Sequence, residues 1–281
     1  MLTSGSDSHP LHCCRRLVMP LLISFVLLLT IGPVALASSH TPSLIGPKKF
    51  YLALGDSLAF GYQPDLNYDD GYVNDFYANL QTHGVTSNAN MSCPGETSVT
   101  FLNGKCPAPF LRKYPYLGPQ LNAALSYLRQ HAGQISPVTL DIGANDILPD
   151  INTTTCSVNT NKFNADLATL DANLTQIILP DLHKALIVHG QTTGDLLLMN
   201  YYNPYQNICP STLTYLERLN QHLARDAQGY GSLVNVFAAF GGASQPHVCS
   251  YTWMCTIFKD IHPQNLGYSV IASAFETDTG Y

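Results

Sequence analysis

Short apolar runs alternate with longer stretches of helical spacing along most of this 281-residue chain. The short runs predict five strands, at residues 50–54, 85–91, 138–142, 195–199 and 233–237. In the stretches between and after them, apolar residues recur every three to four positions. This spacing predicts helices at residues 72–81, 117–131, 164–186, 211–227 and 266–275. Because strands that alternate with helices form a parallel sheet covered on both faces, the sequence predicts an α/β fold.

Two residues indicate how individual helices begin and end. Pro180 falls inside the predicted helix 164–186, where its ring and missing N–H are expected to kink or break the helix. Ser211 stands at the start of the next predicted helix and is expected to cap it.

The first 37 residues have the three parts of a secretory signal peptide. An arginine pair at 15–16 precedes an apolar stretch at 17–31, and residues 35–37 read Ala-Leu-Ala, a small-x-small cleavage motif. We expect cleavage between Ala37 and Ser38, which would leave a secreted chain with no stable membrane span. The alternative is an uncleaved membrane anchor, since the apolar stretch is close to the length that spans a bilayer.

Six cysteines remain beyond the signal peptide, and an exported chain can oxidise them to disulfides. Six cysteines can pair in many ways, and the sequence leaves the pairing open. We favour the sequential pairs, because each would close one long loop: Cys93–Cys106, Cys156–Cys209 and Cys249–Cys255. The cysteines lack the C-x-x-C spacing of a zinc site, so we expect no metal.

The net charge of the chain is −6, and it contains no long basic run. Both features argue against a nucleic-acid partner, which requires a positive surface for the phosphates.

A serine and a histidine stand where a nucleophile and its base could meet. Ser57 directly follows the first predicted strand, within Gly-Asp-Ser at 55–57, and a hydroxyl becomes nucleophilic only when a base takes its proton. His262 precedes the last helix, and Asp260 beside it could orient the imidazole ring. Taken alone, Gly-Asp-Ser is a frequent turn, and a lone histidine is more often a surface residue.

Two further residues could stabilise a developing oxyanion. Gly95 follows the second strand and could offer its backbone N–H, while Asn145 follows the third strand and could offer its side-chain amide. The alternatives are a simple turn glycine and an Asx turn or helix cap. The neighbouring Asp146 is expected to have a structural role in either case.

The residues Ser57, Gly95, Asn145 and His262, in this order, resemble the SGNH (GDSL-type) esterase and lipase superfamily. The resemblance extends from residue 50 to about residue 275. The segment Cys-Pro-Gly-Glu-Thr and the six cysteines are similar to the secreted bacterial branch of these lipases.

The resemblance implies a flavodoxin-like three-layer α/β/α sandwich with a central parallel sheet of about five strands. Together with the signal peptide at 1–37 and a short polar linker at 38–47, both indicated by their own composition, it predicts an SGNH hydrolase domain at 48–281. It also implies no cofactor, a small-molecule ester or lipid substrate and a monomeric enzyme.

The chemistry that the resemblance implies is hydrolysis of carboxylic esters through an acyl-enzyme. Ser57 would attack the ester carbonyl, and His262 would act first as base and then as acid. The oxyanion hole would consist of the Ser57 and Gly95 N–H groups and the Asn145 side chain. Two alternatives stay open, which are deacetylation of polysaccharides and a non-catalytic binding module on the same fold.

One departure from the family pattern concerns the third member of the triad. The family's last motif reads Asp-x-x-His, but the position three residues before His262 is occupied by Lys259. Asp260 stands only two residues before the histidine. Either Asp260 reaches the ring through a shifted turn, or a backbone carbonyl orients the ring.

Aromatic residues near these motifs leave two interpretations open. Tyr201, Tyr202 and Tyr205 follow the fourth predicted strand and could line an acyl pocket or pack in the core. Trp253 precedes His262 by nine residues and could border the site.

Overall fold

A computed structural model describes residues 44–281 of the chain. The predicted signal peptide, its cleavage site and most of the linker lie outside the described residues, and the division of the chain at residues 37 and 47 stays a prediction. Within residues 44–281, no helix combines the length and apolar character needed to cross a membrane.

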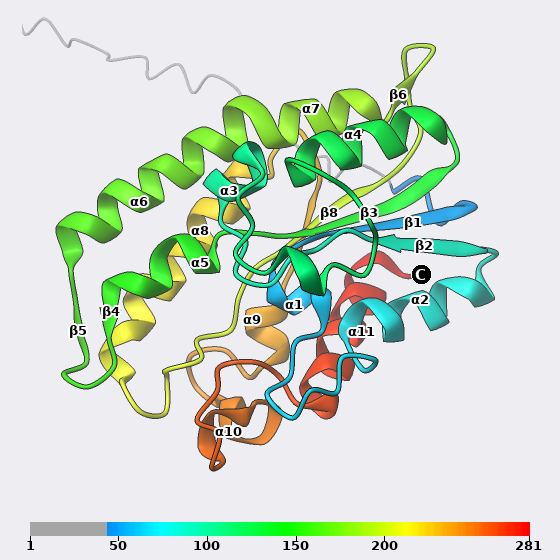
Figure 1. Cartoon of the computed structure of the whole chain (residues 1–281). Helices are drawn as coiled ribbons and strands as arrows, with labels where there is room; N and C mark the ends of the chain where they lie inside the picture. Colours follow the sequence, from blue (N-terminus) through cyan, green and yellow to red (C-terminus); the bar gives the residue numbers. More distant parts are fainter. Residues whose placement is uncertain (1–43) are drawn as a thin grey trace, which may run out of the picture. The chain divides into compact units, whose positions relative to one another are not determined.

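Five parallel strands form the central sheet, in the order β2-β1-β3-β8-β9 (Figure 1). Their bounds are β1 Phe50–Gly55, β2 Ser87–Asn90, β3 Ile135–Asp141, β8 Leu196–Met199 and β9 Ser232–Val234. The three central strands are buried almost throughout, as expected for parallel strands between two helical layers. The strand order reverses between β1 and β3, which is the switch point of a flavodoxin-like sheet. The predicted fold is confirmed.

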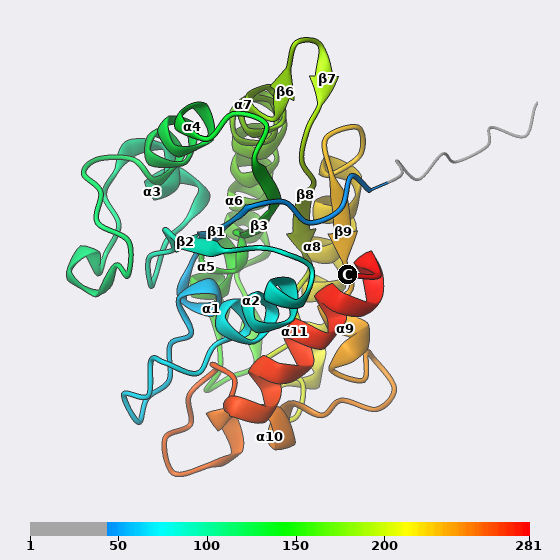
Figure 2. The ribbon, with the colours of Figure 1, turned by 90° about the vertical axis from the view of Figure 1, so that its right-hand side faces the viewer.

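Helices cover both faces of the sheet. α2 (Tyr72–Thr82) and α11 (Asn265–Thr279) lie side by side on one face, as Figure 2 shows. The other face is covered by α4 (Gln120–Gln130), α6 (Thr160–Asn173) and α7 (Leu179–Ala185), with α8 (Leu213–Asp226) packed against α6. The apolar faces of these helices and the buried strands form one hydrophobic core.

Short helices and turns surround the carboxyl end of the sheet. The short helices are α1 Ser57–Phe60, α3 Ser98–Asn103, α5 Ala144–Ile147, α9 Val236–Ala239 and α10 Val248–Tyr251. Single 3₁₀ turns occupy Pro109–Leu111, Leu148–Asp150, Pro210–Thr212 and Trp253–Cys255. Two small antiparallel hairpins that the sequence analysis did not predict pair β4 (Ile151–Asn152) with β5 (Ser157–Val158), and β6 (Ile187–Val188) with β7 (Gln191–Thr192).

Two local predictions are wrong. The strand predicted at 233–237 ends at Val234, because the Asn235 side chain caps α9 by accepting a hydrogen bond from the Ala238 N–H. Ser211 does not cap α8, since it lies within the 3₁₀ turn that precedes this helix and its hydroxyl donates to the Cys156 carbonyl. The helix predicted at 164–186 is interrupted next to Pro180, as expected: residues Leu174–Ile178 form a π-helical turn between α6 and α7, and Pro180 lies in the first turn of α7.

Candidate active site

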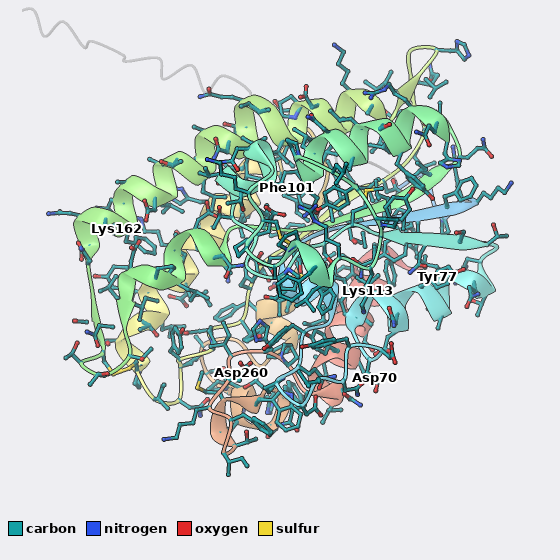
Figure 3. The ribbon with its side chains drawn as sticks, in the orientation of Figure 1. Asp70, Tyr77, Phe101, Lys113, Lys162 and Asp260 are labelled. Atoms are coloured by element: carbon teal, nitrogen blue, oxygen red, sulfur yellow. A yellow bond between two sulfur atoms is a disulfide. The ribbon has the colours of Figure 1, made fainter. Side chains whose placement is uncertain are left out.

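The residues singled out in the sequence meet at the carboxyl end of the sheet, where ligands bind in folds of this type. Ser57 begins α1 directly after β1, and Asn145 lies in α5, just after β3. His262 lies in the loop that precedes α11. Asp260, labelled in Figure 3, comes from the same loop.

Ser57, His262 and Asp260 form a continuous hydrogen-bonded chain. The Ser57 Oγ lies 2.8 Å from the His262 Nε2, and the Asp260 Oδ1 lies 2.7 Å from the His262 Nδ1. Burial raises the pKa of Asp260, but the hydrogen bond to His262 and its charge outweigh burial, and the net pKa lies below the usual value. An ionised carboxylate only accepts hydrogen bonds, so Nδ1 carries the proton and Nε2 is free to accept the serine proton.

A tight turn brings Asp260 to the imidazole ring. Lys259 adopts a left-handed backbone conformation with φ +49°, which reverses the chain just before Asp260. The His262 N–H donates to the Asp260 Oδ1 at 2.8 Å, and the Tyr202 hydroxyl donates to the Ile261 carbonyl at 2.7 Å. Of the two arrangements that the sequence left open, the structure places the carboxylate, by a shifted turn, at Nδ1.

The turn that presents Ser57 depends on a glycine and on a buried carboxyl group. Gly55 has φ +139°, and a Cβ there would lie 1.4 Å from the Asp141 Oδ1, so no other residue fits. The Asp56 carboxyl accepts from the Leu58 N–H at 2.9 Å and so caps α1. The Asp56 N–H in turn donates to the Asp141 Oδ1 at 3.2 Å. These contacts fix the start of α1, where Ser57 stands.

Asn145 is held next to this turn. Its Nδ2 donates to the Glu96 carbonyl at 3.0 Å and to the Asp56 Oδ2 at 3.2 Å. Because Glu96 directly follows Gly95, the bond to Glu96 ties Asn145 to the Gly95 turn. Gly95 has φ +81°, and a Cβ there would press against the Pro107 ring at 3.1 Å, so this position favours glycine.

Carboxyl groups are concentrated beneath the site. Burial, with the charges of Asp146 and Glu96, raises the pKa of Asp56 to about 7, although the Leu58 N–H opposes this shift. Burial and the Asp56 charge raise the pKa of Asp141 well above its usual value. Burial also raises the pKa of Asp146 to about 6.

Asp146 has the structural role expected from the sequence. Its carboxylate accepts from the Ser98 N–H at 2.9 Å and from the Ser98 hydroxyl at 2.6 Å, which anchors α3 to α5.

The six cysteines of residues 44–281 form the disulfides Cys93–Cys106, Cys156–Cys209 and Cys249–Cys255, the sequential pairs favoured above. The Cys249–Cys255 bridge closes the loop that leads to His262. In the described part of the chain, the cluster with metal-ligand spacing is Cys93, Glu96 and Cys106. Because its two sulfurs are joined in a disulfide, it offers no thiolate to a metal.

A cavity of about 30 Å³ adjoins Ser57 and His262. Apolar side chains form most of its wall, and they include Ile147, Tyr201, Tyr202, Leu216, Leu219 and Ile261. Tyr205 and Trp253 are not among the lining residues, and Trp253 instead donates its Nε1–H to Gln63. The α8 leucines are lining residues that sequence reasoning missed, because their helical spacing indicates only a buried face.

Comparison with known proteins shows one family. The model of the GDSL-like lipase/acylhydrolase family matches residues 53–270. None of the curated proteins compared matches the chain.

Several solved structures share the fold at low sequence identity. A lipase from a goat rumen metagenome is 19% identical with a TM-score of 0.61, covering 83% of this chain and 97% of the lipase. An acetylxylan esterase from Geobacillus stearothermophilus is 18% identical with a TM-score of 0.52, covering 85% and 97%. Phospholipase A1 from Streptomyces albidoflavus NA297 is 18% identical with a TM-score of 0.53, covering 82% and 99%.

Proposed function

Because the chain belongs to the GDSL-like lipase/acylhydrolase family and is therefore a carboxylester hydrolase, we propose that it cleaves esters through an acyl-enzyme on Ser57. The observation that carries this proposal is the 2.8 Å separation of the Ser57 Oγ and the His262 Nε2, with Asp260 on the far side of the ring. This arrangement of nucleophile, base and orienting carboxylate is the one that serine hydrolases share across unrelated folds.

The first half of the reaction transfers the acyl group to the enzyme. The Ser57 Oγ attacks the ester carbonyl carbon while its proton passes to the His262 Nε2, and the Asp260 carboxylate stabilises the imidazolium that forms. The carbonyl oxygen becomes an oxyanion, which the Ser57 N–H, the Gly95 N–H and the Asn145 Nδ2 would stabilise. The C–O bond then breaks, and the leaving alcohol takes the proton from Nε2.

The second half of the reaction releases the acid. Water gives a proton to the His262 Nε2 while its oxygen attacks the acyl carbon. The bond between the acyl carbon and the Ser57 Oγ then breaks, and Nε2 returns the proton to Oγ. In the resting structure both Asn145 amide hydrogens have internal acceptors, at Asp56 and Glu96. One of these bonds therefore has to weaken when Asn145 donates to the oxyanion. Losing an oxyanion donor typically costs about 10²–10³ in turnover.

Active-site labelling tests the nucleophile directly. A fluorophosphonate should label the wild-type enzyme once, and Ser57→Ala should abolish both the labelling and the hydrolysis of p-nitrophenyl acetate. Ser269→Ala is the matched control, because Ser269 is exposed on α11 and bonds only Asp75. Labelling that persists in Ser57→Ala would overturn the proposal.

We also propose that the protein is secreted after removal of residues 1–37. Three disulfides support this, because disulfides persist in oxidising compartments outside the cytosol. N-terminal sequencing of the exported protein should begin at Ser38. An N-terminus that retains the apolar stretch would favour the membrane anchor.

The second candidate function is deacetylation of polysaccharides, which uses the same catalytic groups. The apolar pocket beside Ser57 is compatible with it, since an acetyl group is the smallest acyl group that would need to fit there. Comparing acetylated xylan with phospholipid and triglyceride substrates would separate the two functions. The hypothesis of a non-catalytic binding module is favoured by the missing aspartate three residues before His262. It loses this support, because the Asp260 carboxylate lies at the His262 Nδ1 instead.

A further inference from the structure

The side chain of Gln120 is bonded to the turn at residues 55–57, which carries Ser57. Gln120 is the first residue of α4 and is fully buried. Its Oε1 accepts from the Gly55 N–H at 2.7 Å, and its Nε2 donates to the Gly55 carbonyl at 3.0 Å. β1 continues to Gly55, whereas the neighbouring β2 ends at Asn90. The Gln120 amide therefore takes the place of a strand beside Gly55.

The same amide also reaches the turn that contains Gly95. The Gln120 Nε2 donates to the Glu96 Oε2 at 3.0 Å. Glu96 directly follows Gly95, and its backbone carbonyl accepts from the Asn145 Nδ2 at 3.0 Å. One buried side chain is therefore bonded both to the turn at 55–57 and to Glu96, which adjoins the other two oxyanion donors.

Packing alone does not account for an amide at this position. Gln120 stands on the buried face of α4 with Leu121 and Ala124, where an apolar side chain would pack without the cost of burying an amide. The three hydrogen bonds offset that cost. Gln120 is not among the residues that line the cavity beside Ser57, so any effect on catalysis passes through the groups that it holds.

Oxyanion stabilisation depends on where the donors stand before the substrate arrives. Donors that are held in place need no reorganisation as charge develops on the carbonyl oxygen, and a shift of about 1 Å costs about a hundredfold in rate. We propose that Gln120 is a positioning residue, which fixes the two turns that carry the oxyanion donors relative to each other. This inference rests on the proposed acyl-enzyme mechanism and adds to it a residue outside the family motifs.

Gln120→Leu tests this role, because leucine retains much of the bulk and removes all three hydrogen bonds. We expect kcat and kcat/KM for p-nitrophenyl acetate to fall together by about a hundredfold, since the lost interaction acts in the transition state. Here kcat is expressed per active site, with the sites counted by fluorophosphonate labelling carried to completion. A smaller folded fraction then does not lower it.

Asp195→Ala is the control for a loss of stability alone. Asp195 is also buried and also holds backbone N–H groups, those of Ile45 and Gly46, but it precedes β8 at the opposite end of the sheet. Its replacement should leave kcat per site nearly unchanged.

Glu96 supplies a second pair of variants, which keeps the test decisive if Gln120→Leu does not fold. Glu96→Gln retains an oxygen that can accept the Gln120 Nε2–H, and kcat should stay close to that of the wild type. Glu96→Leu removes this acceptor and should lower kcat by about tenfold, because the Gly95 turn is then no longer tied to Gln120. The double variant Gln120→Leu/Glu96→Leu should lose no more than Gln120→Leu alone, since both changes break one network.

The inference is overturned if kcat per site in Gln120→Leu matches that in Asp195→Ala, or if Glu96→Gln loses as much as Glu96→Leu. Losses that multiply in the double variant would also overturn it, because the two residues would then act independently. A wild-type enzyme that neither hydrolyses the ester nor takes up the label would instead overturn the acyl-enzyme proposal itself.

Discussion

The Asp260 Oδ1 lies 2.7 Å from the His262 Nδ1, although a single residue separates the two in the sequence. The same oxygen accepts the His262 backbone N–H at 2.8 Å. One carboxylate oxygen thus both closes a local Asx-type turn and orients the imidazole ring. The left-handed conformation of Lys259 makes this short connection possible.

This contact predicts the effect of changing Asp260. Asp260→Asn retains an oxygen that can close the turn but removes the charge that stabilises an imidazolium. We expect kcat for p-nitrophenyl acetate to fall by about 10²–10⁴, the upper limit being the loss seen when a trypsin-type triad loses its aspartate charge. Lys259→Asn is the control, because asparagine tolerates the left-handed conformation, and it should leave kcat nearly unchanged. A loss of less than about tenfold in Asp260→Asn would favour a serine–histidine dyad.

The same turn shows where sequence reasoning stops. The short apolar runs predict the five strands, since strands buried between two helical layers need apolar side chains on both faces. Ser57, Asn145 and His262 are predicted from their places at strand and helix ends. The position of Asp260 depends on the backbone conformation of Lys259, a residue type that gives no signal for a left-handed turn.

Tertiary packing decides other details that no local pattern contains. The strand predicted at 233–237 gives way to α9 because Asn235 caps this helix and is itself held by distant residues: its Oδ1 accepts from the Asn200 Nδ2 and its N–H donates to the Asp278 carboxylate. The leucines of α8 have the period of a buried helix face, but the cavity that they line is formed with residues from four other parts of the chain.

The buried carboxyl groups predict that stability falls as pH rises. Burial raises the pKa of Asp56 to about 7 and that of Asp146 to about 6. Between about pH 4 and pH 7 the folded protein therefore retains protons that the unfolded chain has lost, so the free energy of unfolding falls as pH rises through this range and levels off above it. Asp260 acts in the opposite sense, but its lowered pKa places its effect at more acidic pH. We expect Tm to decrease from pH 5 to pH 8.

Asp56→Asn should reduce the fall of Tm between pH 5 and pH 8, because an amide does not ionise. Removal of the Asp56 carboxylate also lessens the negative charge facing Asp141. Calorimetric Tm values at pH 5, 6, 7 and 8 provide the measurement. Asp69→Asn is the matched control, as Asp69 is exposed. Parallel pH curves for the two variants would show that Asp56 does not carry the effect.

The disulfides should separate stability from activity. The Cys156–Cys209 bridge spans 53 residues and the Cys249–Cys255 bridge spans 6. Loop-closure entropy predicts losses of about 4 and about 2 kcal/mol when these bridges are removed as paired serine variants.

The shorter bridge should matter more for turnover. Trp253 lies inside the loop that the Cys249–Cys255 bridge closes, and its backbone N–H donates to the His262 carbonyl at 3.0 Å. Loosening this loop displaces the base, and we expect kcat to fall by about tenfold to a hundredfold in Cys249→Ser/Cys255→Ser. Urea unfolding and p-nitrophenyl acetate kinetics measure the two effects, and equal kcat values for the two paired variants would contradict the assignment.

Replacing Asp195 should lower the stability of the fold without lowering turnover. Its carboxylate accepts from the Ile45 and Gly46 N–H groups, each at 2.8 Å, from the Ser136 hydroxyl at 3.2 Å and from the Tyr281 hydroxyl. One side chain thus holds the segment that precedes β1 and the last residue of the chain. Asp195→Ala leaves these donors without their charged acceptor, and we expect a cost of about 2–4 kcal/mol in the free energy of unfolding.

The location of Asp195 explains why catalysis should survive this change. Asp195 precedes β8, at the amino end of the strands, whereas Ser57 lies beyond their carboxyl end. Tyr281→Phe is the graded control, because it removes one of the donors and should cost only about 1 kcal/mol. Urea unfolding gives the stabilities, and kcat for p-nitrophenyl acetate in the folded fraction should match the wild type. A kcat that falls in proportion to stability across the two variants would show that the amino end of the sheet is coupled to the site, contrary to this prediction.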